Sequence, residues 1–236
     1  MTSDFSAATA VLLPGSGSDG DFVRRAYAPL TALCARVLAV DARPPSVEAA
    51  YRSALDDAAA LGPVVVCGVS LGSVIGSRWA AERCGAGVAG LVLALPPWTG
   101  PTAPDTPAAL AARVTADTVD AVGPVEATAR MRSSSPGWLA RELSRSWAAH
   151  GAFLSPALRE AAACPGPTGV ELARVHTPTV VIGARGDAVH PAAVADEWAS
   201  AIPAATALTV ELAELGGDPA VLGRVAAKAL GWAARP

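Results

Sequence analysis

Cysteine and histidine are scarce in this sequence, and neither is arranged as a metal site or a disulfide framework. The four cysteines, Cys34, Cys67, Cys84 and Cys164, form no Cys-x-x-Cys pair, and the chain has only three histidines. A zinc site is therefore not expected, and a chain of this size does not need disulfides to stabilise its core. We expect the cysteines to be buried, reduced thiols in a cytoplasmic protein.

The sequence also lacks an excess of charge and a targeting segment. Its net charge is −3, which gives no reason to expect nucleic acid or an anionic membrane surface as a partner. Residues 1–10 contain no basic region followed by an apolar one, so no secretory signal is predicted. Two charge-free stretches, 58–77 and 84–104, are interrupted by glycine and proline. They suit buried strands better than membrane spans.

Apolar residues, by contrast, are abundant at 52% of the chain, and they form short runs that alternate with helical patterns. We expect strands at 10–13, 36–41, 64–67, 88–95, 179–183 and 208–212. Helices are predicted between them and after them, at 21–34, 47–61, 71–83, 170–175, 191–202 and 219–234. This alternation is typical of a doubly wound parallel sheet in an α/β protein.

The alternation is interrupted between residues 99 and 168, where no strand-like run occurs. Proline-led helical patterns fill this region, at 107–122, 124–132, 136–150 and 156–163, and proline is favoured in the first turn of a helix. The sequence therefore predicts a core of residues 1–98 and 169–236. Residues 99–168 would form a helical cap insertion over the carboxyl ends of the strands.

One motif stands at the junction of a predicted strand and a predicted helix. It reads Gly68–Val69–Ser70–Leu71–Gly72. A serine in a sharp turn between strand and helix is strained, and the turn closes only if neighbouring side chains are absent. Its hydroxyl would stand at the amino end of a helix, where the helix dipole favours developing negative charge. Ser70 is therefore a candidate nucleophile.

Over nearly its whole length the chain resembles the α/β-hydrolase superfamily, with the helical insertion as its cap. The motif around Ser70 is similar to the nucleophile elbow of that superfamily. Residues 12–17, Leu-Leu-Pro-Gly-Ser-Gly, resemble its oxyanion loop, with Pro14 where a histidine is frequent. The resemblance implies that the backbone N–H groups of Ser16 and Leu71 bind an oxyanion, and that Gly15 borders the substrate.

The stretch 180–191 resembles the loop that carries the catalytic acid, which makes Asp187 the candidate. The catalytic histidine should follow the last strand, but there Gly217 occupies its position. The three histidines supply the substitutes. His190 lies three residues after Asp187 and is the first choice as base, His150 ends a predicted cap helix, and His176 falls at the amino end of a strand and is expected to be structural.

Removing the histidine from a serine triad costs on the order of 10⁶ in kcat, so its identity decides what the protein can do. We expect a serine hydrolase acting on an ester or thioester, with Ser70, Asp187 and His190 as catalytic residues. Two alternatives stay open: a lyase, cyclase or isomerase on the same scaffold, and a non-catalytic protein that binds a small molecule.

Trp98 and Trp138 belong to the cap or its junction with the core, and with His150 they are candidates for contact with substrate. Packing of cap on core is the alternative role for these tryptophans. A small-molecule acyl compound is the expected partner, with no cofactor, metal, nucleic acid or membrane, and a homodimer is considered.

Overall fold

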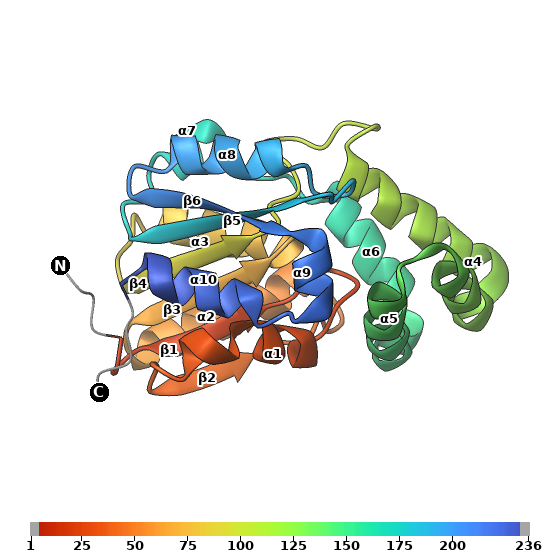
Figure 1. The fold of residues 1–236 in the computed structure, drawn as a ribbon, viewed down its shortest axis with the longest axis horizontal. Helices are drawn as coiled ribbons and strands as arrows, with labels where there is room; N and C mark the ends of the chain where they lie inside the picture. Colours follow the sequence, from red (N-terminus) through yellow and green to blue (C-terminus); the bar gives the residue numbers. More distant parts are fainter. Residues whose placement is uncertain (1–4, 232–236) are drawn as a thin grey trace.

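The computed structural model describes residues 5–231 and contains a six-stranded sheet with all neighbouring strands parallel (Figure 1). The strand order across the sheet is β2-β1-β3-β4-β5-β6. The strands are β1 (Thr9–Leu13), β2 (Arg36–Ala39), β3 (Val64–Val69), β4 (Val88–Ala94), β5 (Thr179–Arg185) and β6 (Ala205–Glu211). The predicted parallel α/β sheet is thus confirmed.

Helices connect the strands and cover both faces of the sheet. They are α1 (Gly20–Thr31), α2 (Val47–Leu61), α3 (Leu71–Glu82), α4 (Pro107–Ser134), α5 (Gly137–His150), the 3-10 turn η1 (Gly151–Phe153), α6 (Leu154–Ala163), α7 (Gly169–Leu172), α8 (Ala192–Ala201), α9 (Leu212–Gly217) and α10 (Val221–Ala229). The predicted helices 107–122 and 124–132 are the two arms of α4, which bends at Gly123, where φ is +80°.

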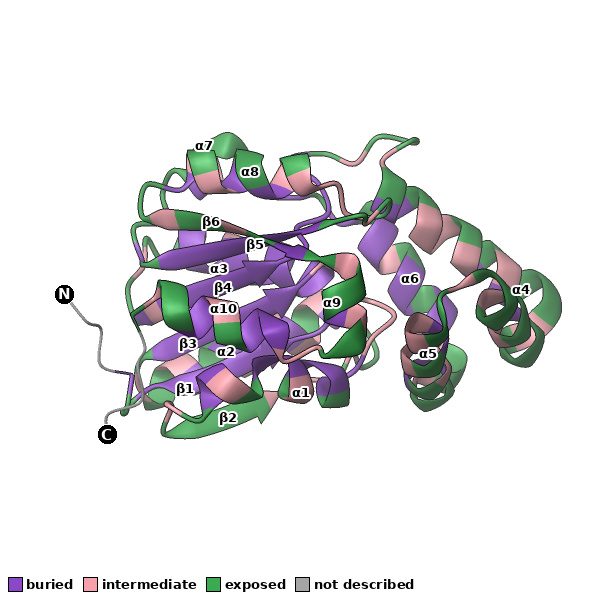
Figure 2. Ribbon diagram, in the orientation of Figure 1, coloured by how far each residue is buried: buried purple, intermediate pink, exposed green. Residues whose placement is uncertain are grey.

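Strand β3 shows how the apolar runs of the sequence build two cores. Successive side chains of a strand point to opposite faces, and here both faces are covered. Val64 and Val66 belong to the cluster formed with α2, α3 and α8, whereas Val65 and Cys67 belong to the cluster formed with α1 and α10. Every residue of β3 is buried, which explains why its sequence is continuously apolar (Figure 2).

Helices α4, α5 and α6, which we call the α4–α6 insertion, lie beyond the carboxyl ends of the strands (Figure 1). Two of the contacts that hold them there come from Ser146 and Glu160. Ser146 of α5 donates a hydrogen bond to the carbonyl oxygen of Gly17, shortly after β1, at 2.7 Å. The Glu160 carboxylate of α6 accepts hydrogen bonds from the Val47 and Glu48 N–H groups, both at 2.8 Å, at the start of α2.

The Glu160 contact predicts a measurable share of the stability. Its carboxylate binds two of the N–H groups that a helix leaves unpaired at its amino end. We expect Glu160→Ala to lower the free energy of unfolding by about 1–2 kcal/mol, as loss of a helix cap does. Chemical denaturation measures this. Glu197→Ala is the control, because Glu197 is exposed and has no hydrogen bond or ion pair in the described part of the chain, and an equal loss in both variants would contradict the assignment.

The carboxyl-terminal part of the core departs most from the sequence prediction. β6 begins at Ala205 rather than 208. The predicted start was too late because this edge strand is half exposed and lacks the apolar run of the central strands. The turn expected after it is the short helix α9, which brings Leu215 into the core. The closing helix begins at Val221. Its predicted end at Ala234 lies outside the described residues, as do residues 1–4 of the stretch searched for a secretory signal.

All four cysteines are free, as expected, but they are not all buried. Cys67 and Cys164 are buried, Cys34 is half-buried and Cys84 is exposed. Cys84 lies in the turn after α3, where the chain leaves the core before β4 begins. Within residues 5–231, no helix has both the length and the apolar character that a membrane crossing requires.

Candidate active site

Ser70 occupies a strained turn between β3 and α3. Its φ of +53° lies in the left-handed region, which is uncommon for a residue with a side chain. A Cβ at Gly68 would lie 2.5 Å from the backbone of Gly72, and a Cβ at Gly72 would lie 2.1 Å from the Leu13 carbonyl oxygen. The Ser70 N–H donates to the Ala94 carbonyl oxygen at 2.9 Å, which ties the turn to the end of β4. The two glycines thus permit the turn as the sequence indicated.

The β1–α1 loop approaches Ser70 closely. A Cβ at Gly15 would lie 3.4 Å from Ser70 Cβ and 3.9 Å from its Oγ. Within residues 5–231, neither the Ser16 N–H nor the Leu71 N–H donates a hydrogen bond to another protein group. Leu71 is the first residue of α3, where N–H groups have no partner inside the helix. Neither N–H group named from the sequence thus has a protein acceptor, and their binding of an oxyanion stays a prediction.

Asp187 and His190 form a compact unit in the loop after β5. One Asp187 oxygen, Oδ1, accepts the backbone N–H of Val189 at 2.8 Å and that of His190 at 3.0 Å. The other, Oδ2, lies 2.9 Å from His190 Nδ1. Burial alone would raise the pKa of Asp187, but the hydrogen bonds and charge of His190 and the Val189 N–H outweigh it and lower that pKa below its ordinary value. The carboxylate is thus held in its charged form.

The His190 ring joins this unit to Ser70. Its Nε2 lies 2.9 Å from Ser70 Oγ, while its Nδ1 faces the Asp187 carboxylate. A carboxylate only accepts hydrogen bonds, so Nδ1 carries a proton, and in the neutral imidazole Nε2 then presents its lone pair to the serine hydroxyl. The side chains of His190 and Asp187 are only 17% and 9% exposed. The arrangement can accept the serine proton, which is the task of a general base.

The other two histidines make no contact with Ser70. His176 is exposed and precedes β5, at the amino end of the sheet. His150 Nδ1 lies 2.8 Å from the Ser146 carbonyl oxygen. Gly217, at the position where the superfamily resemblance implies a histidine, is exposed, and a Cβ there would meet nothing within 4 Å. Asp218 is engaged by Arg224 at 2.6 Å on the surface.

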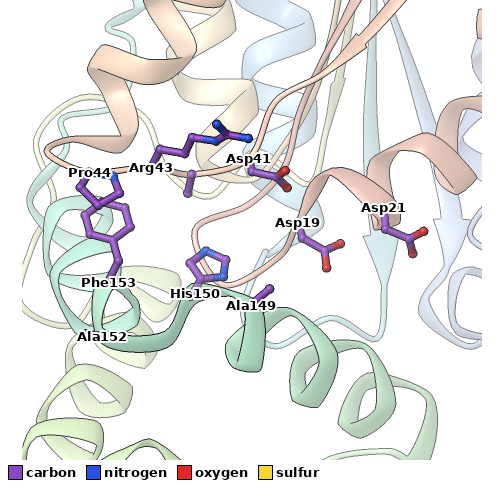
Figure 3. Close-up of a pocket in the computed structure, with 10 residues that line it drawn as sticks. Asp19, Asp21, Asp41, Arg43, Pro44, Ala149, His150, Ala152 and Phe153 are labelled. Atoms are coloured by element: carbon purple, nitrogen blue, oxygen red, sulfur yellow. The ribbon is translucent and has the colours of Figure 1, made fainter.

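His150 faces a pocket of about 660 Å³ between the α4–α6 insertion and the loops that follow β1 and β2 (Figure 3). Its Nε2 is buried and has no hydrogen-bond partner among the described residues. The pocket is lined by Asp19, Asp21, Asp41, Ala42, Arg43, Pro44, Ala149, His150, Ala152 and Phe153. Ser70 does not line it. Within residues 5–231, no group of three histidine, cysteine, aspartate or glutamate side chains could hold a metal ion.

The tryptophans named from the sequence pack between core and insertion. Trp98 is buried and its indole N–H donates to the Cys164 carbonyl oxygen at 3.2 Å. The Trp138 ring lies so close to Gly216 that a Cβ there would be 2.3 Å from its Nε1. Trp138 therefore covers the chain beside Gly217. Contact of either ring with substrate stays a prediction.

The fold and the sequence together identify the family. The description "Alpha/beta hydrolase family" applies to a profile that matches residues 10–219. The chain belongs to the alpha/beta hydrolase family. No curated protein matches the sequence significantly.

Several solved structures share the fold. A thermophilic esterase from Thermogutta terrifontis is 19% identical, with 96% of this chain and 90% of that chain covered and a TM-score of 0.71. The enol-lactonase from Burkholderia xenovorans LB400 is 19% identical over 93% and 90%, with a TM-score of 0.71. An esterase from Exiguobacterium antarcticum is 14% identical over 96% and 92%, with a TM-score of 0.73. At these identities the likeness establishes the fold alone.

Proposed function

We propose that the protein is a serine hydrolase that cleaves an ester or thioester with Ser70 as its nucleophile. The observation that carries the proposal is the chain of two contacts of 2.9 Å, from Ser70 Oγ to His190 Nε2 and from His190 Nδ1 to Asp187 Oδ2. A nucleophile, a base and a group that orients the base define this chemistry. The esterases and the enol-lactonase of similar fold agree with it.

The reaction follows from these contacts. Ser70 Oγ attacks the carbonyl carbon, and its proton passes to His190 Nε2. The carbonyl oxygen becomes an oxyanion that the Ser16 and Leu71 N–H groups bind. His190 then gives the proton to the leaving alcohol or thiol, and an acyl ester on Ser70 remains. Water attacks that ester with His190 again as base, and the carboxylic acid leaves.

Asp187 orients the His190 ring and stabilises the imidazolium that forms after proton transfer. The base follows the acid by three residues instead of lying after the last strand. The chain order Ser, Asp, His is nevertheless the order of the α/β-hydrolases. We therefore propose that His190 replaces the histidine that is absent at Gly217.

The α4–α6 insertion would act as a cap over this site. Its Trp138 and His150, with Trp98 at the junction and Gly15 beside Ser70, are the proposed substrate contacts. A cytoplasmic location and a homodimer are further expectations from the sequence, and light scattering on the purified chain tests the second.

A fluorophosphonate probe read by intact mass tests the nucleophile. We expect one adduct on the unaltered protein and none on Ser70→Ala, because the probe forms a covalent bond with an activated serine. Ser73→Ala is the matched control, since Ser73 is a buried serine in the same turn whose Oγ bonds the Ala94 carbonyl oxygen. An adduct that persists in Ser70→Ala would exclude Ser70 as nucleophile.

The same variant separates the alternatives. If the protein were a lyase, cyclase or isomerase that does not form an acyl-serine, Ser70→Ala would retain substantial turnover. If it only bound a small molecule, a ligand would raise the melting temperature with no turnover. A hydrolase loses nearly all activity in Ser70→Ala.

A further inference from the structure

Three consecutive residues of α5 contact the loop between β1 and α1. Ser146 is 2% exposed and its Oγ donates to the Gly17 carbonyl oxygen at 2.7 Å. Arg145 Nη1 pairs with Asp19 Oδ2 at 2.5 Å. The Trp147 indole covers the same loop, because a Cβ at Gly17 would lie 3.2 Å from its Nε1. One turn of α5 thus lies directly on the loop.

The core itself holds this loop at its two ends. At one end, Gly15 lies against Ser70 and its carbonyl oxygen accepts the Ser18 N–H at 3.0 Å. At the other, Asp19 Oδ1 accepts the Phe22 N–H at 2.9 Å and caps α1. Gly17 lies between these two ends. In the described part of the chain, the hydrogen bond that its carbonyl oxygen accepts from outside the loop comes from Ser146.

We propose that Ser146 is a positioning residue for the oxyanion hole: it fixes Gly17 and thereby the N–H of the preceding residue, Ser16. The inference rests on the proposed function, in which Ser16 binds the oxyanion. Such a donor acts only when it lies within about 2.7–3.1 Å of the developing charge. A displacement of about 1 Å can cost 10²-fold in rate. The α4–α6 insertion therefore contributes to the geometry of the chemical step as well as to the substrate pocket.

Ser146→Ala tests the proposal, with 4-nitrophenyl butyrate as substrate. We expect kcat to fall by roughly 10–100-fold while KM changes little, because an interaction made in the transition state affects kcat rather than ground-state binding. Ser144→Ala is the matched control. Among the described residues its Oγ bonds only within α5, to the Ala140 carbonyl oxygen at 2.6 Å, so both constants should stay unchanged.

Amide hydrogen exchange of residues 15–19, followed by mass spectrometry, supplies the second measurement. We expect faster exchange in Ser146→Ala than in Ser144→Ala and the unaltered protein, because the loop loses the hydrogen bond that Ser146 donates to Gly17. Unchanged exchange overturns the proposal, and so does faster exchange with unchanged kcat, which would make Ser146 merely structural. If the unaltered protein neither hydrolyses the ester nor reacts with a fluorophosphonate, the proposed function itself fails and the inference fails with it. The fluorophosphonate result distinguishes the two failures.

Discussion

His190→Ala is expected to abolish measurable ester hydrolysis, with kcat lowered by on the order of 10⁶, as for removal of the base from a serine triad. The reason is geometric. His190 Nε2 is the group that lies 2.9 Å from Ser70 Oγ, and among residues 5–231 no other side chain that could take the proton forms a hydrogen bond with this hydroxyl. The residual rate from the oxyanion hole and substrate binding would be about 10³–10⁴ over water. Steady-state hydrolysis of 4-nitrophenyl butyrate measures the loss.

His176 provides the matched control for this variant. His176→Ala changes an exposed residue at the far end of the sheet and should leave kcat unaltered. If His190→Ala kept more than about a tenth of the activity, well above the residual rate of a triad without its base, His190 would not be the base.

Gly217→His addresses the same question from the opposite side. His190 already contacts Ser70, so the site does not lack a base. A histidine at position 217, where a Cβ meets nothing within 4 Å, would therefore not supply a missing group. We expect no gain of activity from this change. A large gain would show that the contact between His190 and Ser70 does not serve catalysis.

Gly72→Ala is expected to have the largest effect on stability. The new Cβ would lie 2.1 Å from the Leu13 carbonyl oxygen and 2.8 Å from Leu13 Cβ. Leu13 is the last residue of a central strand that pairs with β2 and β3 on its two sides, so it has no room to yield. We expect the free energy of unfolding to fall by about 3 kcal/mol or more, at the upper end of what overpacking costs, or the chain not to fold. Urea denaturation followed by circular dichroism measures the change.

Gly217→Ala is the control for this effect, since it makes the same chemical change where a Cβ meets nothing within 4 Å. It lies at the end of a helix on the surface, and such a substitution should alter stability by no more than about 0.5 kcal/mol. Equal destabilisation in both variants would mean that the close approach of α3 to β1 is not what requires a glycine at position 72.

Much of the fold could be predicted because the central strands are buried on both faces. Val64, Val65 and Val66 alternate between two cores and must all be apolar, so the strand is visible as a run. β6 was harder to predict, since an edge strand with one neighbour is half exposed and its residues carry no such run. The start of α2 followed from its amino-terminal cap, Ser46, whose Oγ accepts the Ala49 N–H at 3.2 Å.

The candidate site was predictable in part for similar reasons. Gly68 and Gly72 mark the turn at Ser70 in the sequence, because a Cβ at either position would collide with nearby backbone atoms. Asp187 and His190 are three residues apart, so one loop conformation brings them together. The contact of Ser146 with Gly17 had no signal in the sequence, because it joins residues 129 positions apart and depends on where α5 lies.

By itself, the sequence determined the alternating strands and helices, the strained serine turn and the identities of the few residues able to act as acid or base. These depend on local spacing and burial, which the order of residues carries directly. Only the tertiary structure decided which of the three histidines meets Ser70 and which part of the insertion lies on the β1–α1 loop. Both depend on distances between segments far apart in the chain, which are set by how the helices pack and not by any local pattern.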